Sequence, residues 1–144
     1  MAKPIPTNHR NVFATIYTHP LLAANSAFDF IQVVNDDGPP SQLTSPYIHS
    51  FVDELQKAGV TTSVVLPHVQ RSWIGKAHFA HTTVKPTYFR PDALGSNGGV
   101  TQSISQNDGG EEWLLVDGTP ATCVQIGLHH YFQEKGPIDM VISG

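Results

Sequence analysis

Two adjacent aspartates, Asp36 and Asp37, follow directly after an apolar, β-rich run at residues 28–34. Like charges this close disfavour each other's ionised form, so a strand end holds both comfortably only beside a counter-charge. A hard divalent cation such as Mg²⁺ or Mn²⁺ supplies that charge, because these ions prefer oxygen ligands. A solvated Asp-Asp-Gly turn that merely ends the strand is the competing interpretation, since Asx-Gly turns are common. From these residues alone, both interpretations stay open.

A second group of polar side chains follows the next predicted strand, at residues 60–66. Its members are donors that suit an anion such as phosphate, and Ser72 is placed to reach a metal as well. They are His68, Gln70, Arg71, Ser72, Lys76 and His78. An ordinary polar surface loop is the competing interpretation for the segment.

A third polar segment, Gly118-Thr119-Pro120, precedes a predicted helix. The first turn of a helix offers free backbone N–H groups and the positive end of the helix dipole, which favour anions. Simple capping by Thr119 is the alternative role. The single cysteine, Cys123, excludes an internal disulfide and any multi-thiolate zinc site, and we interpret it as a small buried hydrophobe.

The elements that must position these segments alternate between strand and helix. We expect strands at residues 28–34, 60–66, 113–116 and 138–142, with helices at 45–58 and 119–134. Ser45 and Thr119 are the expected N-caps, each followed by proline at the first helical position. This order predicts an α/β fold with a parallel, doubly wound, Rossmann-like sheet and helices on both faces. Ligands of such sheets bind beyond the carboxyl ends of the strands, where all three polar segments fall.

Two segments depart from this pattern. Residues 1–27 contain no Asp or Glu and three prolines, and we interpret them as a disordered extension. Residues 84–112 are rich in Gly, Ser, Asn and Gln over most of their length, which predicts a long loop or insertion. We also expect the strand at residues 138–142 to be an unpaired edge of the sheet.

Composition excludes several classes of function. The 144 residues include eight basic and twelve acidic side chains, a formal net charge of −4 with neutral histidines. Such a chain has no general attraction for a nucleic acid polymer or for anionic lipid. No apolar run approaches the roughly 20 residues that span a bilayer. We therefore expect a cytoplasmic protein that binds neither membranes nor nucleic acid polymers.

Three motifs together resemble one known family. Residues 33–38, Val-Val-Asn-Asp-Asp-Gly, resemble the opening strand and signature of the survival protein SurE family of nucleotidases. Residues 116–124 resemble that family's Gly-Thr-Pro-x-x-Cys-Val helix start, and residues 139–144 resemble the strand that ends in its Ser-Gly-x-Asn motif. The amino-acid sequence at residues 45–47 and 66–73 looks most like that of the fungal branch of the family. Some members of this branch carry a tubulin-tyrosine-ligase-like domain further along the chain.

The resemblance implies a metal-dependent phosphomonoesterase that acts on nucleoside 5′- and 3′-monophosphates. By position, Asp36, Asp37 and Ser72 would hold a divalent metal, Mg²⁺ or Mn²⁺, and the two aspartates would be catalytic. The implied substrate-binding residues are Asn35, Gly38, Ser72, Gly118 and Thr119. The chain departs from the family pattern at Thr122, where members commonly have Asp, and after Ser72, where Trp73-Ile74 precede Gly75.

The family domain continues past the position of Gly144, with a further metal ligand, Asn, two residues on. The resemblance therefore implies that residues 28–144 are the amino-terminal part of a SurE-like phosphatase domain, truncated on its carboxyl-terminal side. We expect poor catalysis from this part alone, and a family-type homo-oligomer only with the missing part. A non-catalytic fragment or interaction module with an incomplete metal site is the alternative function.

Overall fold

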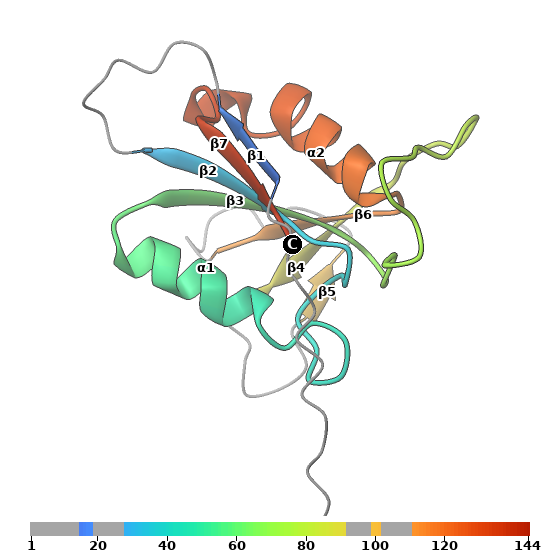
Figure 1. Cartoon of the computed structure of the whole chain (residues 1–144), viewed down its shortest axis with the longest axis horizontal. Helices are drawn as coiled ribbons and strands as arrows, with labels where there is room; N and C mark the ends of the chain where they lie inside the picture. Colours follow the sequence, from blue (N-terminus) through green and yellow to red (C-terminus); the bar gives the residue numbers. More distant parts are fainter. Residues whose placement is uncertain (1–14, 19–27, 92–98, 102–110) are drawn as a thin grey trace, which may run out of the picture.

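The computed structural model describes residues 15–18, 28–91, 99–101 and 111–144. These residues form a seven-stranded sheet in the order β1-β7-β2-β3-β6-β4-β5, with helices α1 and α2 (Figure 1). The elements are β1 (Thr15–Thr18), β2 (Phe30–Val34), α1 (Ile48–Lys57), β3 (Thr61–Pro67), β4 (Pro86–Arg90), β5 (Gly99–Thr101), β6 (Trp113–Val116), α2 (Pro120–His129), the 3₁₀ turn η2 (Gln133–Lys135) and β7 (Met140–Ser143).

The four central strands, β7, β2, β3 and β6, run parallel. Val33 lies opposite Val64 of β3 on one side and Ile142 of β7 on the other. Leu66 of β3 lies opposite Leu115 of β6. This parallel centre confirms the predicted α/β class, and it brings the carboxyl ends of the four strands to one edge of the sheet.

Two apolar layers place α1 and α2 on opposite faces, as predicted (Figure 1). Successive side chains of a strand point to opposite faces, so each strand contributes to both layers. The layer under α1 comprises Ile31, Val33, Ile48, Val52, Val64, Leu66, Phe89, Trp113 and Leu115. The layer under α2 comprises Val34, Val65, Leu114, Val116, Cys123 and Val141. Strands buried on both faces read as continuous apolar runs, which is why their positions were predictable.

The interpretation of residues 84–112 as a long loop is wrong where the structure describes them. β4 pairs antiparallel with β6, and β5 pairs antiparallel with β4. Phe89 is buried and its ring centroid lies 5.7 Å from that of Trp113, so β4 contributes to the core beneath α1. Residues 92–98 and 102–110 lie outside the described residues.

The amino-terminal segment also contains a strand. β1 pairs antiparallel with β7, with Tyr17 opposite Val141. Disorder is therefore the wrong prediction for residues 15–18, while 1–14 and 19–27 lie outside the described part of the chain. The same pairing corrects the second expectation, because β7 lies between β1 and β2 and is not an unpaired edge.

The helix ends differ in part from the predicted ones. Helix α1 begins at Ile48 after Tyr47 and has no side-chain cap, so Ser45 is not its N-cap. Helix α2 begins as predicted, with Thr119 accepting a hydrogen bond from the backbone N–H of Thr122, but it ends at His129. Within the described ranges, no helix has the length and apolar character needed to cross a membrane.

Candidate functional site

The turn after β2 is held by the side chain of Asn35. Its Nδ2 donates to the carbonyl oxygen of Gly38 and to Oγ of Ser45, both at 3.0 Å, while its Oδ1 accepts from the Gly38 N–H at 2.9 Å. Asn35 is buried with Ser45, so these bonds are shielded from water. The turn that carries Asp36 and Asp37 is therefore fixed from inside, and this need for the Ser45 hydroxyl explains why it does not cap α1.

Gly38 allows the loop after β3 to approach this turn. Its φ of +87° lies in the left-handed region, where a side chain is strained. A Cβ added there would lie 3.2 Å from the carbonyl oxygen of Pro67 and 3.2 Å from the carbonyl carbon of Val69. Both a permissive backbone and the absence of a side chain are needed for this contact.

Main-chain hydrogen bonds fix Asp36 between two neighbouring segments. Its N–H donates to the carbonyl oxygen of Gly144 at 3.2 Å, and its own carbonyl oxygen accepts from the Arg71 N–H at 2.6 Å. The next residue in that loop, Ser72, donates from Oγ to Oδ1 of Asp37 at 3.0 Å. The three residues predicted as metal ligands thus meet at the carboxyl edge of the sheet, from segments 35 positions apart in sequence.

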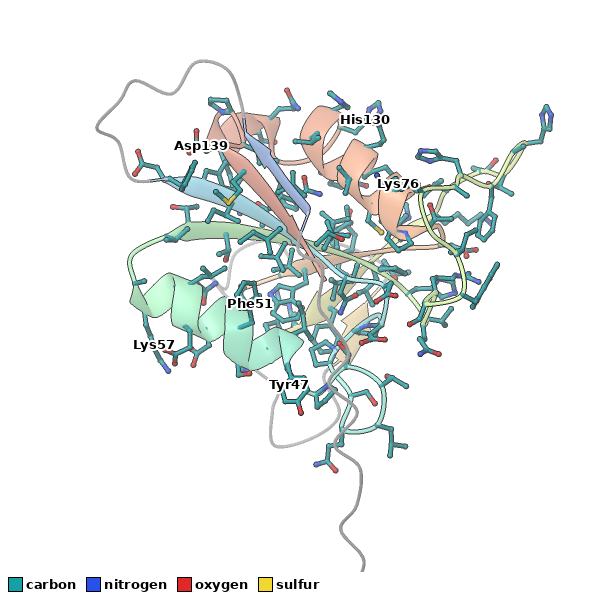
Figure 2. The ribbon with its side chains drawn as sticks, viewed as in Figure 1. Tyr47, Phe51, Lys57, Lys76, His130 and Asp139 are labelled. Carbon is teal, nitrogen blue, oxygen red and sulfur yellow. The ribbon has the colours of Figure 1, made fainter. Side chains whose placement is uncertain are left out.

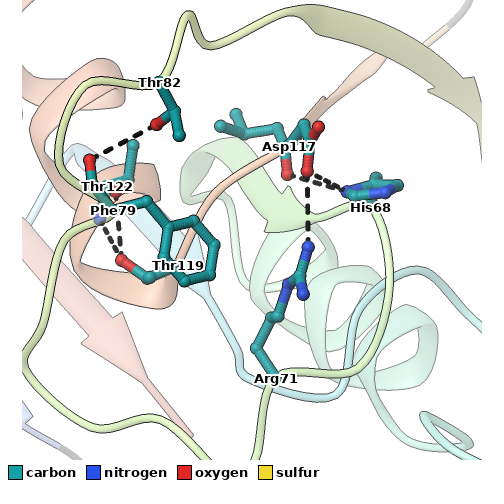
Figure 3. A network of polar contacts seen from close by, with 8 residues as sticks. His68, Arg71, Phe79, Thr82, Asp117, Thr119 and Thr122 are labelled. Atoms are coloured by element: carbon teal, nitrogen blue, oxygen red, sulfur yellow. Dashed lines mark hydrogen bonds and ion pairs between the residues drawn. The ribbon is translucent and has the colours of Figure 1, made fainter.

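The charge around the pair suits a cation. In the described part of the chain, no ion pair with a basic side chain is formed by Asp36 or Asp37. The neighbouring Arg71 is directed to Asp117, with Nη2 3.3 Å from Oδ1 (Figure 3). Two half-buried carboxylates beside a hydroxyl are a hard oxygen donor set, which fits Mg²⁺ or Mn²⁺. Among the residues described, no third His, Cys, Asp or Glu joins them.

Thr119 has a structural role at the start of α2. Its side chain is fully buried, and its hydroxyl donates to the Ala77 carbonyl oxygen at 2.6 Å and accepts from the Thr122 N–H at 3.1 Å. The predicted cap is confirmed. The hydroxyl is already bonded inside the protein, Gly118 and Thr119 are both buried, and the Gly118 N–H donates to the Val116 carbonyl oxygen at 2.8 Å. Substrate contact at this segment would therefore require these residues to become exposed. That contact stays a prediction.

The donors of residues 68–78 do not converge as one group. His68 Nδ1 lies 3.4 Å from Oδ1 of Asp117, and His78 Nδ1 lies 3.1 Å from Oγ1 of Thr122. Lys76 is exposed and lies on the α2 side of the sheet (Figure 2). Of the six predicted donors, only Arg71 and Ser72 form hydrogen bonds with the acidic turn in the described residues.

A cavity of about 350 Å³ opens beside the turn, which sequence reasoning did not predict. Its lining includes the polar residues Asn35 and Asp37 and the apolar residues Tyr47, Phe51 and Ile142. Tyr47 is 79% exposed and Phe51 is 39% exposed at the start of α1 (Figure 2). Helical spacing groups Phe51 with the buried Ile48 and Val52, and the partial exposure of its side chain cannot be predicted from that spacing.

Comparison of the sequence with known proteins identifies the family of this chain. Residues 31–144 match the family described as Survival protein SurE. The chain belongs to the SurE family. A 5′-nucleotidase SurE from Geobacter metallireducens is 30% identical over 114 residues, covering 79% of this chain and 34% of that protein. One from Methylobacterium sp. is 42% identical over 52 residues, covering 32% of this chain and 20% of that protein.

A fungal protein is also similar. A probable tubulin–tyrosine ligase, PBY1, from Saccharomyces cerevisiae is 36% identical over 134 residues, covering 79% of this chain and 18% of that protein. The chain thus spans about a third of the Geobacter relative and less than a fifth of the yeast one. The match to the SurE family and the similarity to 5′-nucleotidases support a nucleotidase- or phosphatase-like function at the level of the family.

Proposed function

We propose that this chain carries part of the active site of a divalent-metal phosphomonoesterase that hydrolyses nucleoside 5′- and 3′-monophosphates. The observation that carries the proposal is the 3.0 Å contact between Ser72 Oγ and Asp37 Oδ1, beside Asp36, at the carboxyl edge of a parallel sheet. Ligands of open α/β sheets bind at this edge. The similarity to 5′-nucleotidases supports the choice of substrate class.

Each residue of the site has a distinct proposed role. Asp36 and Asp37 bind Mg²⁺ or Mn²⁺ through carboxylate oxygens, and Ser72 adds a neutral oxygen donor from the facing loop. Asn35 and Gly38 hold the turn and the loop at the required separation. When bound, the metal supplies positive charge that stabilises the phosphoryl oxygens of the substrate. Gly118 and Thr119, at the neighbouring strand end, are also proposed to bind the substrate, and this contact would require the two buried residues to become exposed.

A non-catalytic role is the second candidate. The observation that favours it is the absence, in the described residues, of a third His, Cys, Asp or Glu near the acidic pair. Mg²⁺ keeps several waters in many sites, so two carboxylates are compatible with binding. Phosphoryl transfer, however, depends on fixing metal and phosphate in line, and small misplacements are costly in rate. Under this second candidate, metal binds but phosphate release stays at background.

The decisive experiment measures Mn²⁺ affinity and Mn²⁺-dependent phosphate release from a nucleoside monophosphate. It uses the chain extended through the full length of the SurE domain, because we expect poor catalysis from this part alone. We expect Asp36→Asn and Asp37→Asn each to weaken Mn²⁺ binding roughly 10–100-fold, as changes around metal sites commonly do, and to remove most of the phosphate release. Asp53→Asn is the matched control, since it removes the same charge from the outer surface of α1.

The outcomes separate the two candidates. Loss of both signals in the Asp36 and Asp37 variants, with the Asp53 variant unchanged, supports the enzyme. Metal binding without phosphate release above background supports the non-catalytic candidate. Full binding and full phosphate release in both site variants would exclude the proposed metal site.

A further inference from the structure

Arg71 joins the acidic turn to the end of β6. Its backbone N–H donates to the carbonyl oxygen of Asp36 at 2.6 Å. Its guanidinium donates to Oδ1 of Asp117 at 3.3 Å and lies over the ring of Phe79, with the ring centroid 5.4 Å away (Figure 3). The side chain of Arg71 is only 18% exposed. A residue within one short loop is thus anchored to two strand ends at once.

Ser72 directly follows Arg71 in this loop. It is exposed, and so is the following residue Trp73, at 69%. Neither side chain is packed in the core, whereas Arg71 is held by both its main chain and its guanidinium. The loop then turns back, with the Ile74 N–H donating to the Arg71 carbonyl oxygen at 2.9 Å. Arg71 on one side of Ser72 and Trp73 on the other both contact Phe79, the Trp73 ring with a centroid distance of 6.4 Å, but only Arg71 also bonds to the ends of β2 and β6.

We propose that Arg71 is a positioning residue, which holds Ser72 against Asp37 by its ion pair with Asp117 and its contact with Phe79. This inference rests on the proposed metal site. Arg71 acts on the metal through Ser72, and its own charge plays no favourable part. The guanidinium is directed away from the acidic pair, toward Asp117, so it leaves the carboxylates free for a cation.

The two ways in which Arg71 could influence a metal have opposite signs. A cationic side chain near a divalent ion repels it, so loss of that charge alone would tighten metal binding. Loss of the anchor would free Ser72 and weaken metal binding. Arg71→Lys separates the effects further, because lysine keeps the charge but lacks the planar fork that both pairs with a carboxylate and stacks on a ring.

The test is a double-variant cycle read by Mn²⁺ binding to the whole chain, with free Mn²⁺ followed by electron paramagnetic resonance. We expect Arg71→Ala to weaken binding roughly tenfold, within the range for disturbed supports of metal ligands, and Arg71→Lys to weaken it less. If Arg71 acts through Ser72, the Arg71→Ala/Ser72→Ala chain binds no more weakly than Ser72→Ala alone. Lys57→Ala removes a positive charge from α1 and serves as the control.

A second measurement needs no metal. Hydrogen exchange in the metal-free chain should be faster at residues 71–74 in Arg71→Ala than in the unchanged chain, with exchange in β2 and β3 unaltered. Unaltered exchange at residues 71–74, tighter Mn²⁺ binding, or additive effects of the two substitutions would each overturn the positioning role while leaving the aspartate pair intact. Absence of Mn²⁺ binding in the unchanged chain would instead overturn the proposed metal site, and with it the role of Arg71.

Discussion

The contact between Gln32 and Gly127 fixes the distance between β2 and α2. Gln32 is fully buried in the middle of β2, and its Nε2 donates to the carbonyl oxygen of Cys123 at 3.1 Å. A Cβ added at Gly127 would overlap the amide group of Gln32. The amide has no solvent into which it can move. The glycine therefore makes room for a buried polar side chain under the helix.

We predict that Gly127→Ala destabilises the fold. Alanine ordinarily gains roughly 0.5–1 kcal/mol over glycine inside a helix, but overpacking of a filled core costs typically about 1–3 kcal/mol, and the Gln32 hydrogen bond is lost as well. We expect the free energy of unfolding, measured in urea, to fall by about 1–2 kcal/mol on balance. The control is Gly75→Ala, because nothing lies within 4 Å of a Cβ there. Equal stability of the two variants would contradict this account.

Cys123 should be chemically inert in the folded chain. It is fully buried on the side of α2 that faces the sheet, and burial raises the pKa of its thiol to about 12. The raised pKa keeps the thiol protonated throughout the neutral range, and the thiolate is the reactive form. We predict negligible reaction with a disulfide reagent at pH 8 and one rapid equivalent after unfolding in guanidinium. Rapid labelling of the folded chain would show that α2 opens readily.

At the scale of single residues, the sequence indicated which residues share the candidate site better than it indicated which side chains bond to one another. Asp37 and Ser72 were assigned to one site, and the structure brings them into contact. Their metal binding stays a prediction. The pairing of Arg71 with Asp117 was not predictable, because nothing local relates residues 46 positions apart. Ser45 was misinterpreted because a serine before proline favours a helix cap, whereas here Asn35 binds its hydroxyl.

At the scale of elements, two glycines with nearly the same backbone conformation serve different purposes. Gly38 and Gly59 have φ of +87° and +86°. A Cβ at Gly59, just after α1, would meet nothing within 4 Å, while one at Gly38 would press on the backbone that follows β3. Position 59 needs only a residue that tolerates the left-handed backbone conformation. Position 38 also needs a residue without a side chain.

We predict that Gly38→Ala is more damaging than Gly59→Ala. Both carry the left-handed penalty of roughly 1–2 kcal/mol, and only the first also displaces the loop that holds Ser72. The midpoint temperature of thermal unfolding should therefore fall further for Gly38→Ala than for Gly59→Ala. Mn²⁺ binding should weaken in the Gly38→Ala variant alone. A similar loss of metal binding in both variants would show that it follows general destabilisation rather than the loop.

Elements with a continuous apolar run were predictable, and β4 was not. β2, β3 and β6 are buried on both faces, so their sequences carry a strong signal. In β4, only Phe89 is buried and its neighbours are half-buried, and the polar residues on either side of it obscure the pattern. Phe89 lies opposite Trp113 of β6, which is 24 positions further along the sequence, so no local pattern indicates this pairing.

At the scale of the whole molecule, β1 protects the outer side of β7. Without it, β7 would present unpaired backbone groups, which promote association between chains. We predict that removal of residues 1–18 lowers the thermal unfolding midpoint and increases light scattering with concentration. Removal of residues 1–14 leaves the strand in place and is the matched control. Equal behaviour of the two truncations would show that β1 contributes nothing to the sheet.

The parallel central strands and the helices on both faces of the sheet could be predicted from the alternation of strand and helix, together with the family resemblance. The antiparallel strands β1, β4 and β5 could not be predicted, because the order of strands in a sheet is set by contacts between residues far apart in the sequence. β1 was hidden in an acid-free segment with several prolines, and β5 in a polar one. Each joins the sheet beside a strand whose register only the folded structure defines.

The strand order has a consequence for synthesis on the ribosome. β7 is made after every other strand described, yet it is inserted between β1 and β2, which are made first. Until residues 140–143 have emerged, β1 has no neighbour and one side of β2 has no partner. The nascent chain therefore passes through a period in which the unpaired edge of β2, an apolar strand, is accessible to chaperones or to other nascent chains. Slower translation of residues 35–139, between β2 and β7, should therefore lower the yield of folded protein, because it lengthens that period.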